Sequence, residues 1–562
     1  MFEKIPAPTP RENLRALIID SQNLVHSVIK PALHSLGVSY VTSAFNEFHA
    51  KRLYHARHYD IVFLSFNVSR DKDGFHLFEE LKYLNFIKST TTVVFLSAET
   101  STELVNCVVE LQPDDFWVKP LKRSLIQQRL NYLLQIKFKL HKMLYCMQAN
   151  EYSSAMYYAE RQLNDDSLKE YHPRIRRLIG NCLIKLHDYE GAQRYFETLS
   201  CTMKQGWVSI GLANALLLQD KLEEAQDLID KLVTRRDTRF LTYDLLAQYF
   251  IEKGKFDLAY EQTRQASKLA PRNMERNKRL WELARLNHDN LGQLSAVKSM
   301  EKNAKNSIHD SPQLLLNVIR TTIDVATTST DEEAEQYLRA AELEIEKLSL
   351  QPEVQKSYDE QLSILKARVL CCTGKKNVAE AMIKDFSTET HEYTLEDNLD
   401  KMKAFHELGL REKATSVLNG LRAQLESDSF RSIVVSKYLE EESHQREEIR
   451  FTTKELKGMA ATNYKKSRLL PTFTNLYQAF TLSPRDKKIA FNLLKVMVEL
   501  KERDELENNH LKVTDKVMKV LLNESLTKLQ RQRLEQYAEK LDIDLHADKY
   551  EIVTGVFNRK SG

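Results

Sequence analysis

Glycine and proline are scarce in this chain. Its 562 residues include 14 glycines and 12 prolines. Sheet-rich proteins need many tight turns, and these two residues are the usual choice for them. The scarcity therefore favours long helices with short connections over an all-β architecture.

Cysteines and long apolar runs are also few. The six cysteines are irregularly spaced and none forms a Cys-x-x-Cys pair, which fits a reducing cytosol better than a disulfide framework or a zinc site. No apolar run reaches the ~18 residues of a membrane span. Residues 1–11 lack the basic-then-apolar order of a secretory signal. We therefore expect a cytoplasmic protein with no membrane partner.

The chain has almost no charge imbalance and none of the familiar catalytic motifs. Its 82 lysines and arginines against 79 acidic residues leave a net charge of +3, which provides no general field for binding nucleic acid. The P-loop, His-Glu-x-x-His, Gly-x-Ser-x-Gly and kinase signatures are all missing from the sequence. We expect a protein that is not an enzyme and that uses no cofactor, metal or nucleic acid.

The length suggests several domains or one domain with an extended array. Strand-and-helix patterns give way to purely helical ones near residue 135. We predict an N-terminal tail (1–11), an α/β domain (12–135), helical repeats (136–300), divergent helical repeats (301–450), a further repeat (451–505), and capping helices with a tail (506–562).

Short apolar runs alternate with amphipathic stretches in the first domain. Alternation of strands and helices implies right-handed crossovers and a parallel, doubly wound sheet, here of five strands. Function in such a sheet belongs at the carboxyl ends of the strands. The predicted strands are 14–19, 38–44, 60–66, 92–96 and 115–118, with helices at 24–36 and 74–84.

Four segments at these strand ends carry a resemblance. LIID (17–20), YDIVFLSFNVSRDKDG (59–74), VVFLSA (93–98) and PDDFWVKP (113–120) resemble the receiver domain of two-component response regulators. The resemblance implies a phosphoacceptor aspartate on the third strand, two acids that help to hold Mg²⁺, a hydroxyl and a lysine. Asp20, Ser97 and Lys119 match the first acid, the hydroxyl and the lysine, whereas Ser21 replaces the second acid and Ser65 replaces the phosphoacceptor.

These two replacements predict a degenerate receiver. A serine hydroxyl is a weak nucleophile without an adjacent base, and a pocket with one of three carboxylates should bind Mg²⁺ poorly. We therefore expect no phosphorylation by the usual route. Asp71 or Asp73 could substitute as acceptor, but the Asp73-Gly74 pair is better explained as the turn that opens the next helix. Phe116 holds the aromatic position that reorients in active receivers, and we expect it to pack in the core.

The helical part shows internal repetition. Ala155, Ala192, Ala225 and Ala259 recur with a period of about 34 residues, which resembles the tetratricopeptide repeat (TPR). A small residue lies one helix before each of the later three alanines. These residues are Gly180, Ala213 and Ala247, and the two helices of a hairpin should touch there. Stacked hairpins form a superhelix with a concave face. Residues 121–150 contain no glycine or proline and predict one continuous helix from the receiver into the array.

The first helix of each hairpin should line the concave groove. Arginine and asparagine there suit an acidic peptide or a terminal carboxylate, and Arg177 with Asn181 resembles half of the carboxylate clamp of chaperone-binding repeats. Asp244 departs from that clamp, which needs a cation there. The alternative is that these are ordinary solvated residues, and Trp207 is either a core residue or a binding anchor. The register places Arg174, Arg177, Asn181, Lys185, Trp207, Asn214, Leu217, Asp244 and Gln248 in the groove.

The combination resembles bacterial response regulators whose output is a TPR array. It implies a non-enzymatic signalling adaptor, independent of phosphorylation, whose array binds a regulatory protein partner. Two alternatives remain open: a phosphorelay response regulator with a non-standard acceptor, and a direct TPR regulator of a signalling kinase or phosphatase. The partner and the oligomeric state are not determined by the sequence.

Overall fold

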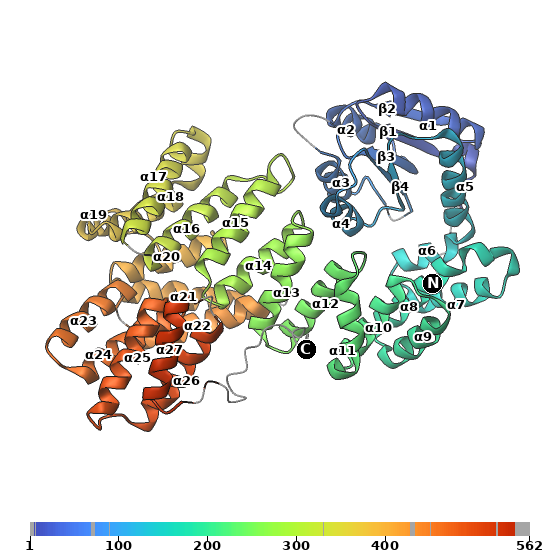
Figure 1. Ribbon diagram of the computed structural model, residues 1–562. Helices are drawn as coiled ribbons and strands as arrows, with labels where there is room; N and C mark the ends of the chain where they lie inside the picture. The colour runs from blue at the N-terminus through green and yellow to red at the C-terminus, as the bar shows by residue number, and fades with distance from the viewer. Residues whose placement is uncertain are drawn as a thin grey trace. The chain divides into compact units, whose positions relative to one another are not determined.

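The computed structural model describes residues 5, 7–68, 73–88, 90–329, 331–427, 433–449, 451–523, 526–543 and 545. The chain forms two compact units, and each is described by itself (Figure 1). The first unit comprises Met1–Tyr249, Gln262–Met274 and Lys302–Asp310, and the second comprises Phe250–Glu261, Glu275–Glu301 and Ser311–Gly562.

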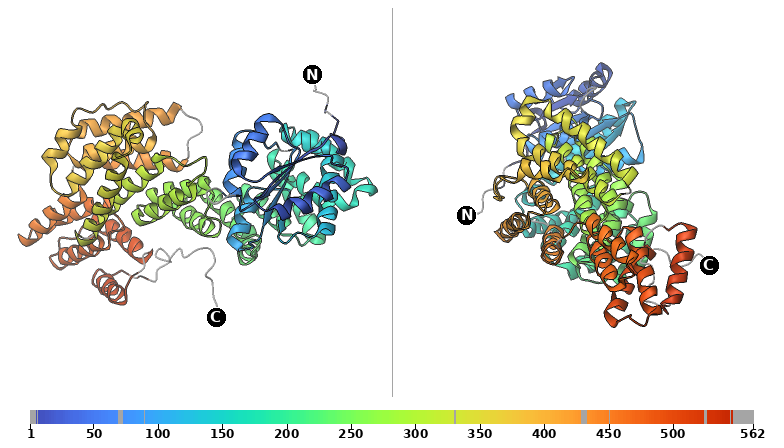
Figure 2. Two further views of the ribbon diagram at one scale, coloured as in Figure 1. Left: turned by 90° about the horizontal axis from the view of Figure 1, so that it is seen from above. Right: turned by 90° about the vertical axis from the view of Figure 1, so that its left-hand side faces the viewer.

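The first unit begins with a five-stranded parallel sheet of order β2-β1-β3-β4-β5. Helices lie on both faces of this sheet (Figure 2). The predicted doubly wound α/β fold is thus confirmed, and the strand positions differ from the predicted ones by at most two residues. The elements are β1 (Arg15–Ile19), α1 (Asn23–Ser35), β2 (Tyr40–Ala44), α2 (Glu47–Ala56), β3 (Ile61–Ser65), α3 (Gly74–Tyr83), β4 (Thr92–Ser97), α4 (Thr102–Glu110), β5 (Asp115–Val118) and α5 (Arg123–Lys139).

Alternate residues of each strand pack into two separate cores, one on each face of the sheet. Ala16 and Ile18 of β1 pack in one core with residues of α1 and α5, such as Leu130. Leu17 and Ile19 pack in the other with residues of α2, α3 and α4. Successive strand side chains point to opposite faces, and a parallel sheet covered on both faces is apolar throughout. Every residue of β3 and β4 is buried for this reason.

The junction between α5 and the array differs from the prediction. Helix α5 ends at Lys139, and α6 (His141–Gln148) begins after Leu140. Backbone hydrogen bonds still span this point, since Leu140 N donates to Ile136 O at 2.9 Å and Leu144 N donates to Leu140 O at 3.0 Å. The prediction of one continuous helix is wrong at Leu140, whose fully buried side chain belongs to the core of the first hairpins. The connection is a bend in helical structure without a linker.

Helical hairpins follow with the predicted TPR-like period. Ala155, Ala192 and Ala225 are fully buried, and a Cβ atom at Gly180 would lie 2.4 Å from the Phe196 ring. The elements are α7 (Tyr152–Leu163), α8 (His172–Lys185), α9 (Tyr189–Thr202), α10 (Gly206–Leu218), α11 (Leu222–Thr234), α12 (Arg239–Glu252) and α13 (Phe256–Leu269), with a 3-10 turn at Asp166–Tyr171.

One left-handed residue closes each of these hairpins. Asn150, His187 and Asp220 have φ of 58°, 59° and 64°, and Gly254 has φ of 67°. Non-glycine residues rarely adopt this conformation, although Asn, Asp and His do so more often than others. Helices commonly end with such a residue, which turns the chain and satisfies the last carbonyl groups.

The second unit is helical throughout its described residues. Two of its cores are centred on α16–α18 and on α23–α27. Among the helix starts that the structure describes, Thr394, Thr452 and Thr527 each form a capping box with the residue three positions later. Besides the parts of α12 and α13 within Phe250–Glu261, its helices are α14 (Met274–Leu286), α15 (Asn290–Ala304), α16 (Pro312–Thr328), α17 (Asp331–Ser349), α18 (Pro352–Cys372), α19 (Lys376–Ile383), α20 (Leu395–Glu407), α21 (Arg411–Ser427), α22 (Ile433–Glu448), α23 (Thr453–Lys465), α24 (Leu469–Leu482), α25 (Lys487–Glu502), α26 (Asn508–Asn523) and α27 (Lys528–Lys540).

Some predictions fall outside the described residues. They are the start of the N-terminal tail, residues 1–4 and 6, and the end of the C-terminal tail, residues 546–562. The predicted boundaries at 300, 450 and 505 stay predictions. No helix in the described part of the chain is both long and apolar enough to span a membrane.

Candidate functional site

The predicted receiver pocket assembles at the carboxyl ends of the strands, where parallel strands bring their following loops together. Lys119 follows β5, Asp20 follows β1 and Ser65 ends β3. The Lys119 Nζ lies 2.7 Å from Asp20 Oδ2 and donates a hydrogen bond of 3.1 Å to Ser65 Oγ. Three residues that are far apart in the sequence thus share one contact through the lysine.

The two other serines of the pocket lie differently. Ser97, at the end of β4, is buried, and its hydroxyl accepts a hydrogen bond of 3.0 Å from Glu99 N. Its backbone carbonyl accepts a hydrogen bond of 2.8 Å from Lys119 N, and this bond holds the lysine backbone against β4. Ser21 is exposed beside Asp20. The structure therefore joins Ser97 to the lysine through the backbone and leaves Ser21 in solvent.

A histidine that the sequence analysis missed supports Asp20. His26 on α1 is buried, its Nε2 lies 2.8 Å from the Asp20 backbone carbonyl, and its Nδ1 lies 2.8 Å from Ser43 Oγ. A carbonyl can only accept, so Nε2 carries the proton and Nδ1 accepts from the serine. Burial lowers the pKa of His26 despite the opposing effect of Asp20. A neutral histidine therefore fixes the loop that carries Asp20.

Asp73 serves as the N-cap of α3. Its Oδ1 accepts a hydrogen bond of 3.0 Å from His76 N, and its Oδ2 forms an ion pair with Arg272. Gly74 must be a glycine, because a Cβ atom there would lie 2.0 Å from the Ser65 carbonyl oxygen. The other alternative acceptor, Asp71, lies outside the described residues.

Phe116 is partly buried against the core formed by α2, α3 and α4, as expected for a packing residue. Within the described ranges, no group of three or more His, Cys, Asp or Glu side chains is placed to hold a metal ion.

The first helix of the predicted groove, α8, carries a row of basic residues. Arg174, Arg177, Asn181 and Lys185 are all exposed along one face of α8, as their spacing of three and four residues requires. In the described part of the chain none of the three cations forms an ion pair. Desolvation and then the charge of Arg174 lower the pKa of Arg177. An anion beside these two arginines would relieve their repulsion.

The other predicted groove residues differ in how exposed they are. Trp207 and Asn214 on α10 are half-buried. The Trp207 ring packs against Phe196 with centroids 6.4 Å apart, and its Nε1 donates to Gln205 Oε1 at 2.5 Å. Asp244 is half-buried and Gln248 exposed on α12. Leu217 is buried, so its predicted place in the groove is wrong: it lies on the packed face of α10.

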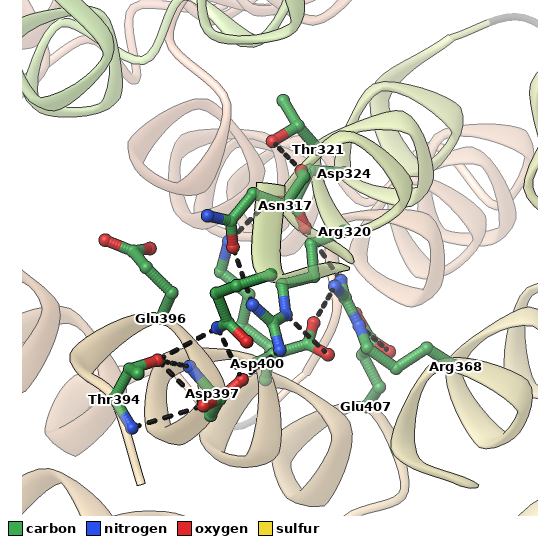
Figure 3. A network of polar contacts seen from close by, with 12 residues as sticks. Asn317, Arg320, Thr321, Asp324, Arg368, Thr394, Glu396, Asp397, Asp400 and Glu407 are labelled. Atoms are coloured by element: carbon green, nitrogen blue, oxygen red, sulfur yellow. Dashed lines mark hydrogen bonds and ion pairs between the residues drawn. The ribbon is translucent and has the colours of Figure 1, made fainter. Parts of the chain in front are cut away.

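A second polar cluster, in the second unit, was not foreseen (Figure 3). The fully buried Arg368 on α18 reaches Asp324 on α16 at 2.8 Å, and Asp400 and Glu407 on α20 at 2.7 Å each. Lys403 adds a contact of 2.6 Å to Asp324. Figure 3 shows Arg320 beside Arg368, with Arg320 paired to Asp397. We call these residues the ion network.

The ion network ties three helices together. Buried charges are tolerated when each has partners, and removing one partner leaves an uncompensated charge. Burial by itself would raise the pKa of Asp324, but Lys403 and Arg368 hold that pKa well below its usual range. A cavity of about 20 Å³ borders the network, between Trp281, Arg320 and Asp400. This is room for about one water molecule, so the cluster is a structural element.

Comparisons with known proteins agree with the first domain. Residues 16–131 match the response regulator receiver domain family. No curated protein matches the chain. Among solved structures, the crystal structure of the APC/C hetero-tetramer Cut9–Hcn1 aligns with 73% of this chain and 98% of its own, at 11% identity and a TM-score of 0.23.

The fold and the pocket together define the class. Residues 16–131 form a response regulator receiver domain, and the described residues after it are helical and begin with TPR-like repeats.

Proposed function

We propose that this protein is a non-enzymatic signalling adaptor whose receiver works without phosphorylation and whose array binds a regulatory protein. The contact between Lys119 and Asp20, extended to Ser65, supports this best. In this contact the lysine meets the Ser65 hydroxyl where an active receiver has its phosphoacceptor aspartate.

The chemistry around Ser65 opposes phosphoryl transfer. A hydroxyl becomes a good nucleophile when a neighbouring base takes its proton. The group that reaches Ser65 Oγ is the Lys119 ammonium, which has three donors and no acceptor. It withdraws electron density from the hydroxyl and cannot remove its proton. Ser65 therefore serves as a hydrogen-bond acceptor in a fixed pocket.

Asp73 is poorly suited to replace the missing acceptor. Both carboxylate oxygens are engaged, one with His76 N and one with Arg272. Leaving the N-cap position costs about 0.5–2 kcal/mol, and Arg272 would lose its partner. These contacts favour the adaptor over a phosphorelay protein with a non-standard acceptor.

The α8 face supports an acidic segment as the bound part of the partner. Arg174, Arg177 and Lys185 present three exposed cations on one helix face, and Asn181 lies between them. Arginine pairs with carboxylates through two parallel hydrogen bonds, and asparagine can bind the peptide backbone. Trp207 on the next hairpin offers a half-buried apolar surface for a neighbouring side chain.

A titration of full-length protein with a fluorescein-labelled deca-glutamate peptide, followed by anisotropy, tests this groove. Arg177→Ala and Asn181→Ala should each weaken binding about tenfold, since a hydrogen bond to a charged group contributes roughly 1.5–3 kcal/mol. Arg236→Ala, an exposed arginine outside α8, is the matched control and should bind like wild type. Higher salt should weaken binding in both the wild type and the control.

Trp207→Ala separates the two interpretations of that residue. A loss of affinity with an unchanged melting temperature identifies an anchor, whereas a large fall in melting temperature identifies a packing role against Phe196. Equal affinity of the wild type and of the Arg177 and Asn181 variants would contradict the groove assignment.

A further inference from the structure

The receiver touches the array far from its covalent junction. Phe240 on α12 and Ala270 after α13 are buried in the same apolar core as Leu104 and Cys107 of α4. Leu241 is partly buried against that core. The receiver is therefore attached to the array at two places, through α5 and through α4.

Polar contacts reinforce this second attachment. Asn106 on α4 donates a hydrogen bond of 3.2 Å to the Leu269 carbonyl. Arg272 pairs with Asp73, and its guanidinium lies over the Phe66 and Phe75 rings, 5.1 and 5.8 Å from their centroids. The charged group is thus held between a carboxylate and two aromatic faces, a geometry that favours arginine. We call the Arg272–Asp73 pair the latch.

The first attachment flanks the start of α8. Tyr132 of α5 stacks on Tyr171, with ring centroids 5.4 Å apart, and Tyr171 donates a hydrogen bond of 2.6 Å to Gln135. Burial and then the charge of Glu170 raise the pKa of Tyr132, and the nearby charge of Arg174 opposes them. The basic face of α8 therefore begins beside the receiver.

The two attachments lie on either side of the α8–α10 groove along the array. In repeat register, Arg174 on α8 corresponds to Trp207 on α10 and to Leu241 on α12, each about one repeat of 34 residues further on. Leu241 packs against the receiver core, so the receiver covers the start of the groove-facing side of α12, whereas Gln248, further along that side, is exposed. Helices α8 and α10 lie between α12 and the α5 junction in the array.

We infer that the receiver forms a roof over the α8–α10 groove. The groove then admits an extended acidic segment with a free end. It excludes a folded acidic surface until the Arg272–Asp73 latch opens. This inference rests on the proposed function of the groove. It gives the latch a role in partner selection, because Asp73, which caps α3, also holds the receiver against the array through Arg272.

The test compares two probes of the same acidic sequence. One is the labelled deca-glutamate peptide with a free end, and the other is that sequence as a linker between two folded ubiquitin domains, which cannot thread under a closed roof. Association rates with full-length protein are measured by stopped-flow anisotropy. Wild type should bind the free-ended probe at least tenfold faster than the blocked probe.

The variants are chosen to open the latch without unfolding the receiver. Asp73→Asn removes the charge and keeps a good N-cap, and Arg272→Gln removes the opposite charge. Each should raise the association rate of the blocked probe several-fold, and the double variant should add little to either. The affinity for the free-ended probe should stay within twofold. Arg236→Gln, which changes the same charge on an exposed side chain, is the control for both probes.

The possible results separate the two claims. Equal rates for the two probes on wild type overturn the roof and leave the groove assignment standing. A blocked probe that stays excluded from both latch variants overturns the role of the Arg272–Asp73 pair. Failure of both probes to bind wild type overturns the acidic groove itself, and the inference with it.

Discussion

The Lys119 ammonium lies 2.7 Å from the Asp20 carboxylate, a side chain with no exposed surface. This ion pair compensates the charge of the buried Asp20 carboxylate. Two carboxylates in such a place without metal would repel each other, and Ser21 and Ser65 remove that repulsion. We therefore expect the pocket to act as a fixed structural element.

Removing the lysine should destabilise the receiver. Lys119→Met leaves Asp20 buried without its cation, which costs about 3–5 kcal/mol. Adding Asp20→Asn should restore most of that loss, because the buried charge is then gone. Native-state hydrogen exchange of β1 and β3 amides measures both effects. Equal protection in wild type and Lys119→Met would show that the contact contributes little.

Arg368 should be critical for the second unit. Replacing it by methionine leaves Asp324, Asp400 and Glu407 without their shared cation, and we expect a loss of about 3–5 kcal/mol. Arg339→Met is the matched control: this side chain is 72% exposed and pairs with Glu335 at 2.5 Å, so its loss should change stability by less than about 0.5 kcal/mol. Hydrogen exchange of α18 and α20 distinguishes the two. Similar protection in both variants would contradict a structural role of the ion network.

The ion network also predicts a dependence on pH. Lys403 and Arg368 hold the pKa of Asp324 below its usual value, against the effect of burial. Its stabilisation is thus present above the unfolded pKa of about 3.9 and is lost as the pH falls through the folded pKa. The free energy of unfolding should fall less steeply in acid for Asp324→Asn than for wild type. Urea unfolding followed by circular dichroism between pH 2.5 and 7 measures both slopes, and identical slopes would contradict the assignment.

The contact between α8 and α9 should not tolerate a methyl group. Gly180→Ala would place a Cβ atom 2.4 Å from the Phe196 ring, and overpacking of this kind costs typically about 1–3 kcal/mol. A smaller partner, Phe196→Leu, should recover part of the loss in the double variant. Thermal unfolding of the two single variants and the double variant tests this. Additive losses would show that the two residues act independently.

Local patterns predicted the receiver well. Each buried strand is a short apolar run, so β3 and β5 could be placed within a residue from sequence. The alanine period located the hairpins because a small residue is required where helices touch. Both signals are local, and the strand ends then bring Asp20, Ser65 and Lys119 together by topology alone.

The missed features depend on distant pairs or on single dihedral angles. Arg272 and Asp73 are 199 residues apart, and no spacing rule connects them. The bend at Leu140 breaks a helical pattern without glycine or proline. The ion network left a weak signal, since Arg368 interrupts an apolar face of α18. Its pairing with Asp324 requires the packed structure.

Mass spectrometry of the intact protein after incubation with acetyl phosphate and Mg²⁺ tests the central claim most directly. The account predicts an unmodified chain, and no ¹⁹F signal of bound beryllofluoride in a parallel sample. Ser65→Asp should remain largely unmodified too, because Ser21 still weakens the metal site. A stoichiometric phosphoryl adduct on the wild type would contradict the account: its removal by hydroxylamine would identify an acyl phosphate, and resistance to hydroxylamine a phosphoserine.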